Sequence, residues 1–240
     1  MSVTLFKIAG ALVLAISVVA ATGALAATDP YPTGLAGYDV SYPQCGGATP
    51  GGSFGIVGVN GGRPFSTNSC LGAEYAAALK SPAPSLYINT GYAGAYRNNI
   101  TAGCSAQSAS VSGTGRQVQA WAIGCSEAEA SMSYATAQGA TNPAAWWLDV
   151  ETANSWSSSN LSLNRYSIQG AVTRLAQSGL PVGIYSTGSM WTAISGGNFT
   201  PSSVAADWEA AGGSCSTPFT SSPVWLVQST TSGFDSDLAC

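Results

Sequence analysis

Apolar, β-prone segments recur along the chain and alternate with segments of helical spacing. Strands are predicted at residues 35–41, 54–60, 85–89, 146–151 and 181–186, with weaker strands at 204–208 and 224–228. Helices are predicted at 68–80, 117–138 and 161–177, where apolar residues recur every three or four positions. Residues 91–116 are rich in Gly, Ser and Ala without a clear period, so they are interpreted as a long loop.

Apolar strands that alternate with helices are typical of a parallel sheet covered on both faces. Neither a Gly-x-Gly-x-x-Gly sequence nor a P-loop is present, which disfavours a nucleotide-binding sheet. The pattern predicts an α/β protein, an irregular TIM-type (β/α) barrel that is regular in its first five units and helix-poor at the end. A single domain over residues 28–240 accommodates it.

Residues 1–27 have the pattern of a secretory signal peptide. Lys7 precedes a short apolar run at 8–16, and Ala24-Leu25-Ala26 supplies the small residues of a cleavage site. The run is shorter than the ~20 apolar residues of a membrane span, which disfavours an uncleaved anchor. We therefore expect a secreted or cell-wall-associated protein that leaves the membrane after cleavage, and we expect a monomer.

The cysteine count supports the same compartment. Six cysteines lie beyond the predicted signal, and an even number in an oxidising compartment predicts three disulfides. Fifteen pairings are possible from the sequence alone. Nearest-neighbour pairing is the working guess: Cys45 with Cys70, Cys104 with Cys125, and Cys215 with Cys240.

Composition narrows the possible chemistry. The net charge of −4 argues against a nucleic-acid partner, which requires a basic surface. The chain has no histidine, so a Ser-His-Asp triad, a Cys-His nucleophile and a His-ligated zinc centre are excluded. Carboxylates and tyrosines remain for acid–base chemistry, and no cofactor is expected.

Two carboxylates end the apolar run that begins at Trp146. Only 8% of the residues are charged, against roughly 25% in an ordinary domain. In a strand, Asp149 and Glu151 share one face, and Leu148 and Val150 take the other. Such a pair suits glycosidic cleavage, in which one acid donates a proton and the other stabilises positive charge. A solvated turn at the end of a strand is the alternative.

Further polar residues fall at or near predicted strand ends, where barrel enzymes place their reacting groups. These residues are Asp39, Asn60, Asn89 and Ser186. Four other acidic residues are expected at the surface: Glu127 and Glu129 on the wet side of the helix at 117–138, and Asp207 and Glu209 near a late strand. Among the aromatic residues, Trp156 and Tyr185 are the ones expected to face a cleft and stack on sugars.

Four segments resemble motifs of the glycoside hydrolase family 25 lysozymes. Residues 37–44 match the opening Gly-x-Asp-Val-Ser-x-x-Gln, and 149–151 match the Asp-x-Glu of the fourth strand. Residues 183–186 resemble the following Gly-x-Tyr strand. Residues 225–228 resemble the late tryptophan strand that ends in Gln, followed by an Asp for which Asp237 and Asp235 compete.

The resemblance implies an N-acetylmuramidase that cuts the β-1,4 bond after N-acetylmuramic acid in cell-wall peptidoglycan. Glu151 would protonate the leaving oxygen. Asp149 would stabilise the developing charge, directly or by orienting the acetamido group of the substrate. Asp39 would join them as the third catalytic carboxylate. The residues expected to bind the polysaccharide are Asp237, Tyr185, Trp156, Asn60, Asn89 and Gln228.

Residues 59–65 depart from the family pattern. They read Val-Asn-Gly-Gly-Arg-Pro-Phe where typical members have a Thr-Glu-Gly type motif, and Cys45 directly after Gln44 is also unusual. Both departures fall where substrate subsites are expected. The alternative prediction is therefore a catalytically weak or inactive wall-associated barrel that binds glycan.

Overall fold

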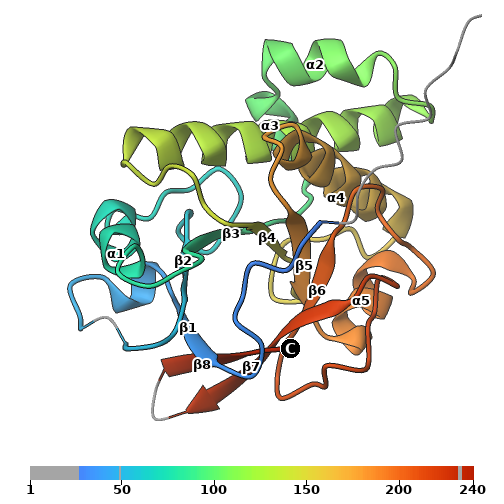
Figure 1. The fold of residues 1–240 in the computed structure, drawn as a ribbon. Helices are drawn as coiled ribbons and strands as arrows, with labels where there is room; N and C mark the ends of the chain where they lie inside the picture. Colours follow the sequence, from blue (N-terminus) through green and yellow to red (C-terminus); the bar gives the residue numbers. More distant parts are fainter. Residues whose placement is uncertain (1–26, 49, 232–233) are drawn as a thin grey trace, which may run out of the picture.

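A computed structural model describes residues 27–48, 50–231 and 234–240, which form a closed eight-stranded barrel with the strands in sequence order (Figure 1). Neighbouring strands from β1 to β7 are parallel, and β8 closes the barrel antiparallel to both β7 and β1. The predicted barrel is confirmed. The signal-peptide prediction falls almost entirely on residues 1–26, outside the described part. The strands are β1 (Ala36–Val40), β2 (Gly55–Gly58), β3 (Ser85–Asn89), β4 (Trp146–Asp149), β5 (Val182–Ser186), β6 (Ala206–Glu209), β7 (Val224–Thr231) and β8 (Phe234–Ala239).

The helices differ from the predicted set in number and position. Among the described residues between β1 and β2, the 3-10 turn η1 is the only helical element, so this connection has no α-helix. A helix that was not predicted, α5, follows β5; Thr187 caps its start and Gly196, with φ of 85°, ends it. The helices are η1 (Tyr42–Gln44), α1 (Leu71–Ala78), η2 (Gly94–Asn99), α2 (Ala102–Ser108), α3 (Gly115–Ala137), α4 (Leu161–Ala176) and α5 (Gly188–Ser195).

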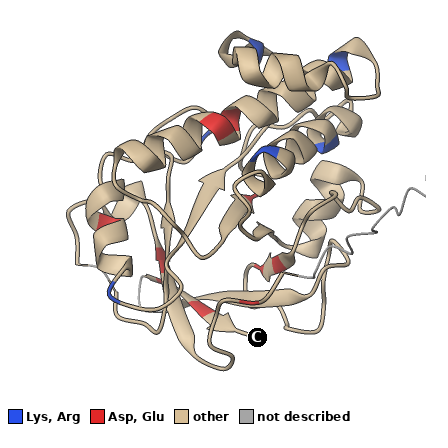
Figure 2. Cartoon of the chain, turned by 45° about the horizontal axis from the view of Figure 1, so that its top comes forward, with Lys and Arg blue, Asp and Glu red and all other residues tan. Residues whose placement is uncertain are grey.

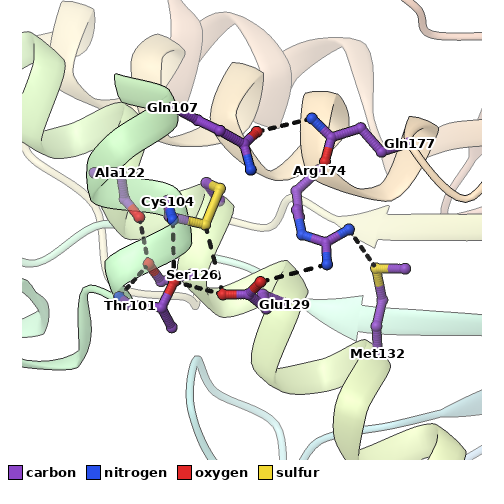
Figure 3. A network of polar contacts seen from close by, with 10 residues as sticks. Thr101, Cys104, Gln107, Ala122, Ser126, Glu129, Met132, Arg174 and Gln177 are labelled. Carbon is purple, nitrogen blue, oxygen red and sulfur yellow. Dashed lines mark hydrogen bonds and ion pairs between the residues drawn. A yellow bond between two sulfur atoms is a disulfide. The ribbon is translucent and has the colours of Figure 1, made fainter. Parts of the chain in front are cut away.

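The predicted loop at 91–116 contains η2 and α2, so that prediction was wrong. Composition alone does not favour a helix there, because Gly and Ser are weak helix formers. Local contacts supply the missing stability: the Thr101 hydroxyl accepts from the Cys104 N–H at 3.2 Å, and Cys104 is bonded to Cys125 of α3. Figure 3 shows this junction, where Thr101 also bonds Glu129 and Arg174 of α4 pairs with Glu129 at 3.4 Å.

Strand β8 was missed because its pattern is inverted. Phe234 and Leu238 point outward and are 38% and 45% exposed, whereas Asp237 points into the barrel and is buried. A strand with apolar residues outside and an acid inside does not match the usual alternation. Its position is fixed by pairing with two strands, including Gly37 opposite Asp237 on β1 and Gln228 opposite Asp237 on β7.

Two separate apolar layers hold the barrel together. Inside it, Trp147, Trp208 and Trp225 pack with Tyr31, whose hydroxyl accepts from the Trp147 N–H at 2.8 Å. Outside it, the opposite faces of the strands pack against the helices, and Leu148 of β4 belongs to this layer. The alternation along β4 therefore sends Trp147 and Asp149 inward, as the sequence predicts.

The three guessed disulfides, Cys45–Cys70, Cys104–Cys125 and Cys215–Cys240, are confirmed. They tie the loop after β1 to the start of α1, α2 to α3, and the connection between β6 and β7 to the residue after β8. All three therefore brace segments that the sheet itself does not pair. In the part of the chain that the structure describes, no helix is both long and apolar enough to cross a membrane.

Helices α3 and α4 cross at two glycines. A Cβ added to Gly124 would lie 1.8 Å from the Ser167 carbonyl oxygen, and one added to Gly170 would lie 2.0 Å from the Trp121 carbonyl oxygen. Both contacting oxygens belong to the backbone, so they cannot move away as a side chain could. The close approach of the two helices therefore requires glycine at these positions.

Gly124→Ala should lower the free energy of unfolding by about 2 kcal/mol or more, because the added methyl group forces the helices apart. Gly115→Ala in the same helix is the matched control, since nothing lies within 4 Å of its Cβ position. The control should be neutral or stabilising by up to about 1 kcal/mol through helix propensity. Urea unfolding of both variants measures the difference, and equal effects would contradict the crossing.

Candidate active site

A cavity of ≈310 Å³ opens at the carboxyl ends of the parallel strands, where barrel enzymes carry their reacting groups. Several acidic residues lie on strands of the barrel, whereas most Lys and Arg residues lie on helices and loops outside it (Figure 2). No Lys or Arg is among the lining residues. These are Asp39, Ser41, Tyr42, Gly62, Tyr87, Asn89, Asp149, Glu151, Ala153, Asn154, Tyr185, Trp208, Gln228 and Asp235.

Asp149 and Glu151 both line the cavity from the end of β4. Asp149 is buried, and amide N–H groups of Asn89 and Asn154 point at its carboxyl oxygens, the latter at 3.5 Å. Burial and the neighbouring Glu151 raise the pKa of Asp149 well above its ordinary value. Burial and the charge of Asp235 raise the pKa of Glu151, which is only partly buried. The pair therefore resists double ionisation and keeps a proton in the cavity.

Asp39 reaches the cavity from β1 and joins a chain of hydrogen bonds. The Gln228 amide donates to Asp39 at 2.9 Å, and the Tyr185 hydroxyl donates to Gln228 at 2.7 Å. Burial is the largest cause that raises the pKa of Asp39 to about 7. These contacts fix the orientation of three of the predicted residues around the floor of the cavity.

Asp237 lies beneath Asp39 and has no exposed surface. Its Oδ1 accepts from the Trp208 indole N–H at 3.0 Å, and its Oδ2 has no hydrogen-bond partner in the described part of the chain. Burial and the charge of Asp39 raise the pKa of Asp237 well above its ordinary value.

Six of the nine predicted site residues line the cavity: Asp39, Asn89, Asp149, Glu151, Tyr185 and Gln228. Asn60, Trp156 and Asp237 do not. Asn60 is fully buried and supports Asn89, donating to its carbonyl at 3.0 Å. The Trp156 indole donates to the Glu151 carbonyl at 2.7 Å and packs in the apolar layers. These three residues support the lining from behind.

Several lining residues were not predicted. Tyr87 stands two positions before Asn89 on β3, so period-two alternation could have placed it on the same face. Ser41 belongs to the opening motif. Tyr42 lies within the opening motif and Trp208 at the end of the predicted strand 204–208, whereas Asn154 lies in a loop and carried no signal in the sequence. Of the two competing aspartates, Asp235 lines the cavity and Asp237 lies under it.

Three acids that were expected at the surface are buried. Asp207 has no exposed surface and accepts from the Phe219 and Thr220 backbone N–H groups at 2.7 and 2.9 Å. Glu209 is 7% exposed, and Glu127 has no exposed surface. The surface predictions for these residues were wrong, whereas Glu129 is half-buried on the outside of α3. Among the described residues, no group of three or more acidic or cysteine side chains is arranged to hold a metal ion.

Comparisons with known proteins agree with this architecture. A family model described as Lysozyme-like protein 1 matches residues 124–208, from α3 to β6. No curated protein sequence matches the chain. Among solved structures, a muramidase from Trichobolus zukalii gives a TM-score of 0.54 at 19% identity, with 86% of this chain and 93% of that one covered.

Two further solved structures give a similar result. A family GH25 lysozyme from Aspergillus fumigatus has a TM-score of 0.55 at 16% identity, with 85% of this chain and 92% of that one covered. The modular autolysin LytC from Streptococcus pneumoniae, solved with a synthetic peptidoglycan ligand, has a TM-score of 0.56 at 13% identity. The match covers 85% of this chain and 46% of that one. The predicted resemblance to family 25 is thus confirmed at the level of the fold.

The raised pKa of Asp39 makes stability depend on pH. Between about pH 4, the ordinary aspartate value, and about 7, the folded protein holds a proton that the unfolded chain releases. This contribution is fully present below about pH 4 and is lost as the pH rises through about 7. The free energy of unfolding should be about 2 kcal/mol lower at pH 8 than at pH 5. Asp39→Asn should flatten this dependence in urea unfolding, and an unchanged slope would contradict the assignment.

Proposed function

We propose that the protein is an exported glycoside hydrolase of the lysozyme type, which cleaves β-1,4 bonds of cell-wall peptidoglycan. The observation that carries the proposal is the placement of Asp149 and Glu151 side by side in one cavity, both with raised pKa values. The shared fold with muramidases supports the same class of substrate. The three disulfides fit an oxidising compartment outside the cytoplasm.

Glu151 is the proton donor in this proposal. It is the more exposed of the two acids, so a glycosidic oxygen can approach it. In this proposal Glu151 carries the proton, and the amide donors directed at Asp149 offset part of the burial that raises the pKa of that residue. As the bond to the leaving sugar breaks, the proton passes from the Glu151 carboxyl to the glycosidic oxygen.

Asp149 stabilises the positive charge that develops on the sugar ring. It does so directly or by holding the acetamido group of the substrate, whose carbonyl oxygen then attacks the anomeric carbon. Glu151, now ionised, removes a proton from the water that completes hydrolysis, and the two displacements together retain the anomeric configuration. Asp39, held by Gln228, and Tyr185, the neighbour of Asp149 on β5, also bind the sugar.

A glycan-binding protein without turnover is the second candidate. It is motivated by the loop after β2, where Gly62 lines the cavity and residues 59–65 bring no acid into it. Tyr42 lies against Gly62, since a Cβ there would be 2.9 Å from the Tyr42 ring. A pull-down on purified peptidoglycan with product analysis separates the two candidates, because retention without release of reducing ends favours binding.

Glu151→Gln should lower the release of reducing ends from purified peptidoglycan by about 100-fold or more, because the amide cannot donate the proton. Binding to the same material should persist, since the side chain keeps its shape. Glu209→Gln is the control, an acid buried near the end of β6 that does not line the cavity. Equal release by the parent and by Glu151→Gln would refute the assignment of Glu151.

A further inference from the structure

Glu127 is a buried acid that the proposed reaction does not use. It lies on α3, has no exposed surface and faces no cation among the described residues. One carboxyl oxygen accepts from the Thr90 hydroxyl at 2.8 Å, and the nearby Gly91 backbone N–H favours the ionised form of the carboxyl. The other oxygen, Oε1, has no donor in the described part of the chain. A buried group with an unmet hydrogen bond is costly, so its retention calls for an explanation.

The segment after β3, which Glu127 contacts, is hydrogen-bonded to the end of β4 and to the loop that follows it. Thr90 donates its backbone N–H to the Asp149 carbonyl at 3.1 Å, and Tyr92 donates to the Ser155 carbonyl at 2.7 Å. The segment after β3 therefore holds both ends of residues 149–155. This stretch, the last residue of β4 and the loop after it, contains Asp149, Glu151 and Asn154, which line the cavity.

The same segment is held from α4. Ser167 donates its hydroxyl to the Gly91 carbonyl at 3.1 Å, so this segment is bonded to α3 through Thr90 and to α4 through Gly91. A Cβ added to Gly91 would lie 2.8 Å from the Ser155 carbonyl oxygen, which shows how closely the segment meets the loop. A displacement of Glu127 would therefore also displace Thr90 and Gly91, and with them the carboxylates at 149–151.

We propose that Glu127 is a positioning residue, which sets the placement of the loop at 149–155 through Thr90 and Gly91. Its consequence for catalysis rests on the proposed function, whereas the placement of the loop does not. Burial raises the pKa of Glu127 to about 8, so the neutral acid is the form below that pH. Glutamine has the shape of that neutral form and can still accept from Thr90.

The test compares Glu127→Ala and Glu127→Gln with Thr90→Val and Thr90→Ser. Glu127→Ala and Thr90→Val remove the hydrogen bond between the two side chains. Glu127→Gln keeps an acceptor there, and Thr90→Ser keeps the hydroxyl. Glu74→Gln is the matched control: Glu74 is also buried with one oxygen lacking a donor, but it lies on α1 and bonds Asn68.

Hydrogen exchange is the readout that does not depend on activity. The Thr90 and Tyr92 amides should exchange about tenfold faster or more in Glu127→Ala and Thr90→Val, with smaller changes in the conservative variants and none in the control. The Val59 amide, bonded to the Tyr87 carbonyl at 2.9 Å, serves as the reference within each protein. Unchanged exchange at Thr90 and Tyr92 in Thr90→Val and Glu127→Ala would overturn the proposal.

Activity on peptidoglycan gives the second readout. Displaced carboxylates should lower kcat by about tenfold to 100-fold with little change in KM, and Glu127→Gln and Thr90→Ser should recover most of the loss. A loss of stability with kcat per folded molecule unchanged would reduce Glu127 to a packing role and overturn the proposal. If exchange responds as expected but the parent protein cleaves nothing, the loop placement stands and the glycosidase assignment fails.

Discussion

The burial of carboxyl groups without cations is the constraint on which the site depends. Removing a carboxylate from water is costly unless hydrogen bonds or protonation offset the loss of hydration. Within residues 27–48, 50–231 and 234–240, the only ion pair joins Arg174 to Glu129 on the outer helices. The acids at the end of the barrel are therefore stabilised by amide, indole and hydroxyl donors and by shared protons.

Those donors come from strands that are distant in the sequence. Gln228 of β7 bonds Asp39 of β1, Trp208 of β6 bonds Asp237 of β8, and Asn89 of β3 bonds Asp149 of β4. The acids can be accommodated only when the barrel is closed. The apolar layers inside and outside the barrel supply the stability that offsets their burial, and the raised pKa values that result suit proton transfer near neutral pH.

Periodicity was sufficient for the parts of the fold whose pattern matches their environment. The strands from β1 to β7, helices α1, α3 and α4, and the inward direction of Asp149 and Glu151 follow from spacing alone. Strand β8 could not be predicted in this way, because it carries Asp237 inward and Leu238 outward. Helix α2 depends on a cap and a disulfide rather than on its composition.

The residues that the sequence placed in the candidate site are those at the ends of predicted strands. Asp39, Asn89, Tyr185 and Gln228 reach the cavity as expected, whereas Asn60 and Trp156 support it from behind. The sequence does not show which helix face meets a strand end, so the burial of Glu127 could not be anticipated. Burial of that residue arises from the close crossing of α3 and α4 at glycines and from the loop that they enclose.

The stereochemistry of the first product tests the central claim most directly. Proton NMR of a peptidoglycan digest, recorded before the new reducing ends mutarotate, gives the anomer that is released. Cleavage by Glu151 with Asp149 as its partner predicts the β anomer first, followed by slow appearance of the α anomer. Initial release of the α anomer, or no new reducing end at all, would contradict the account.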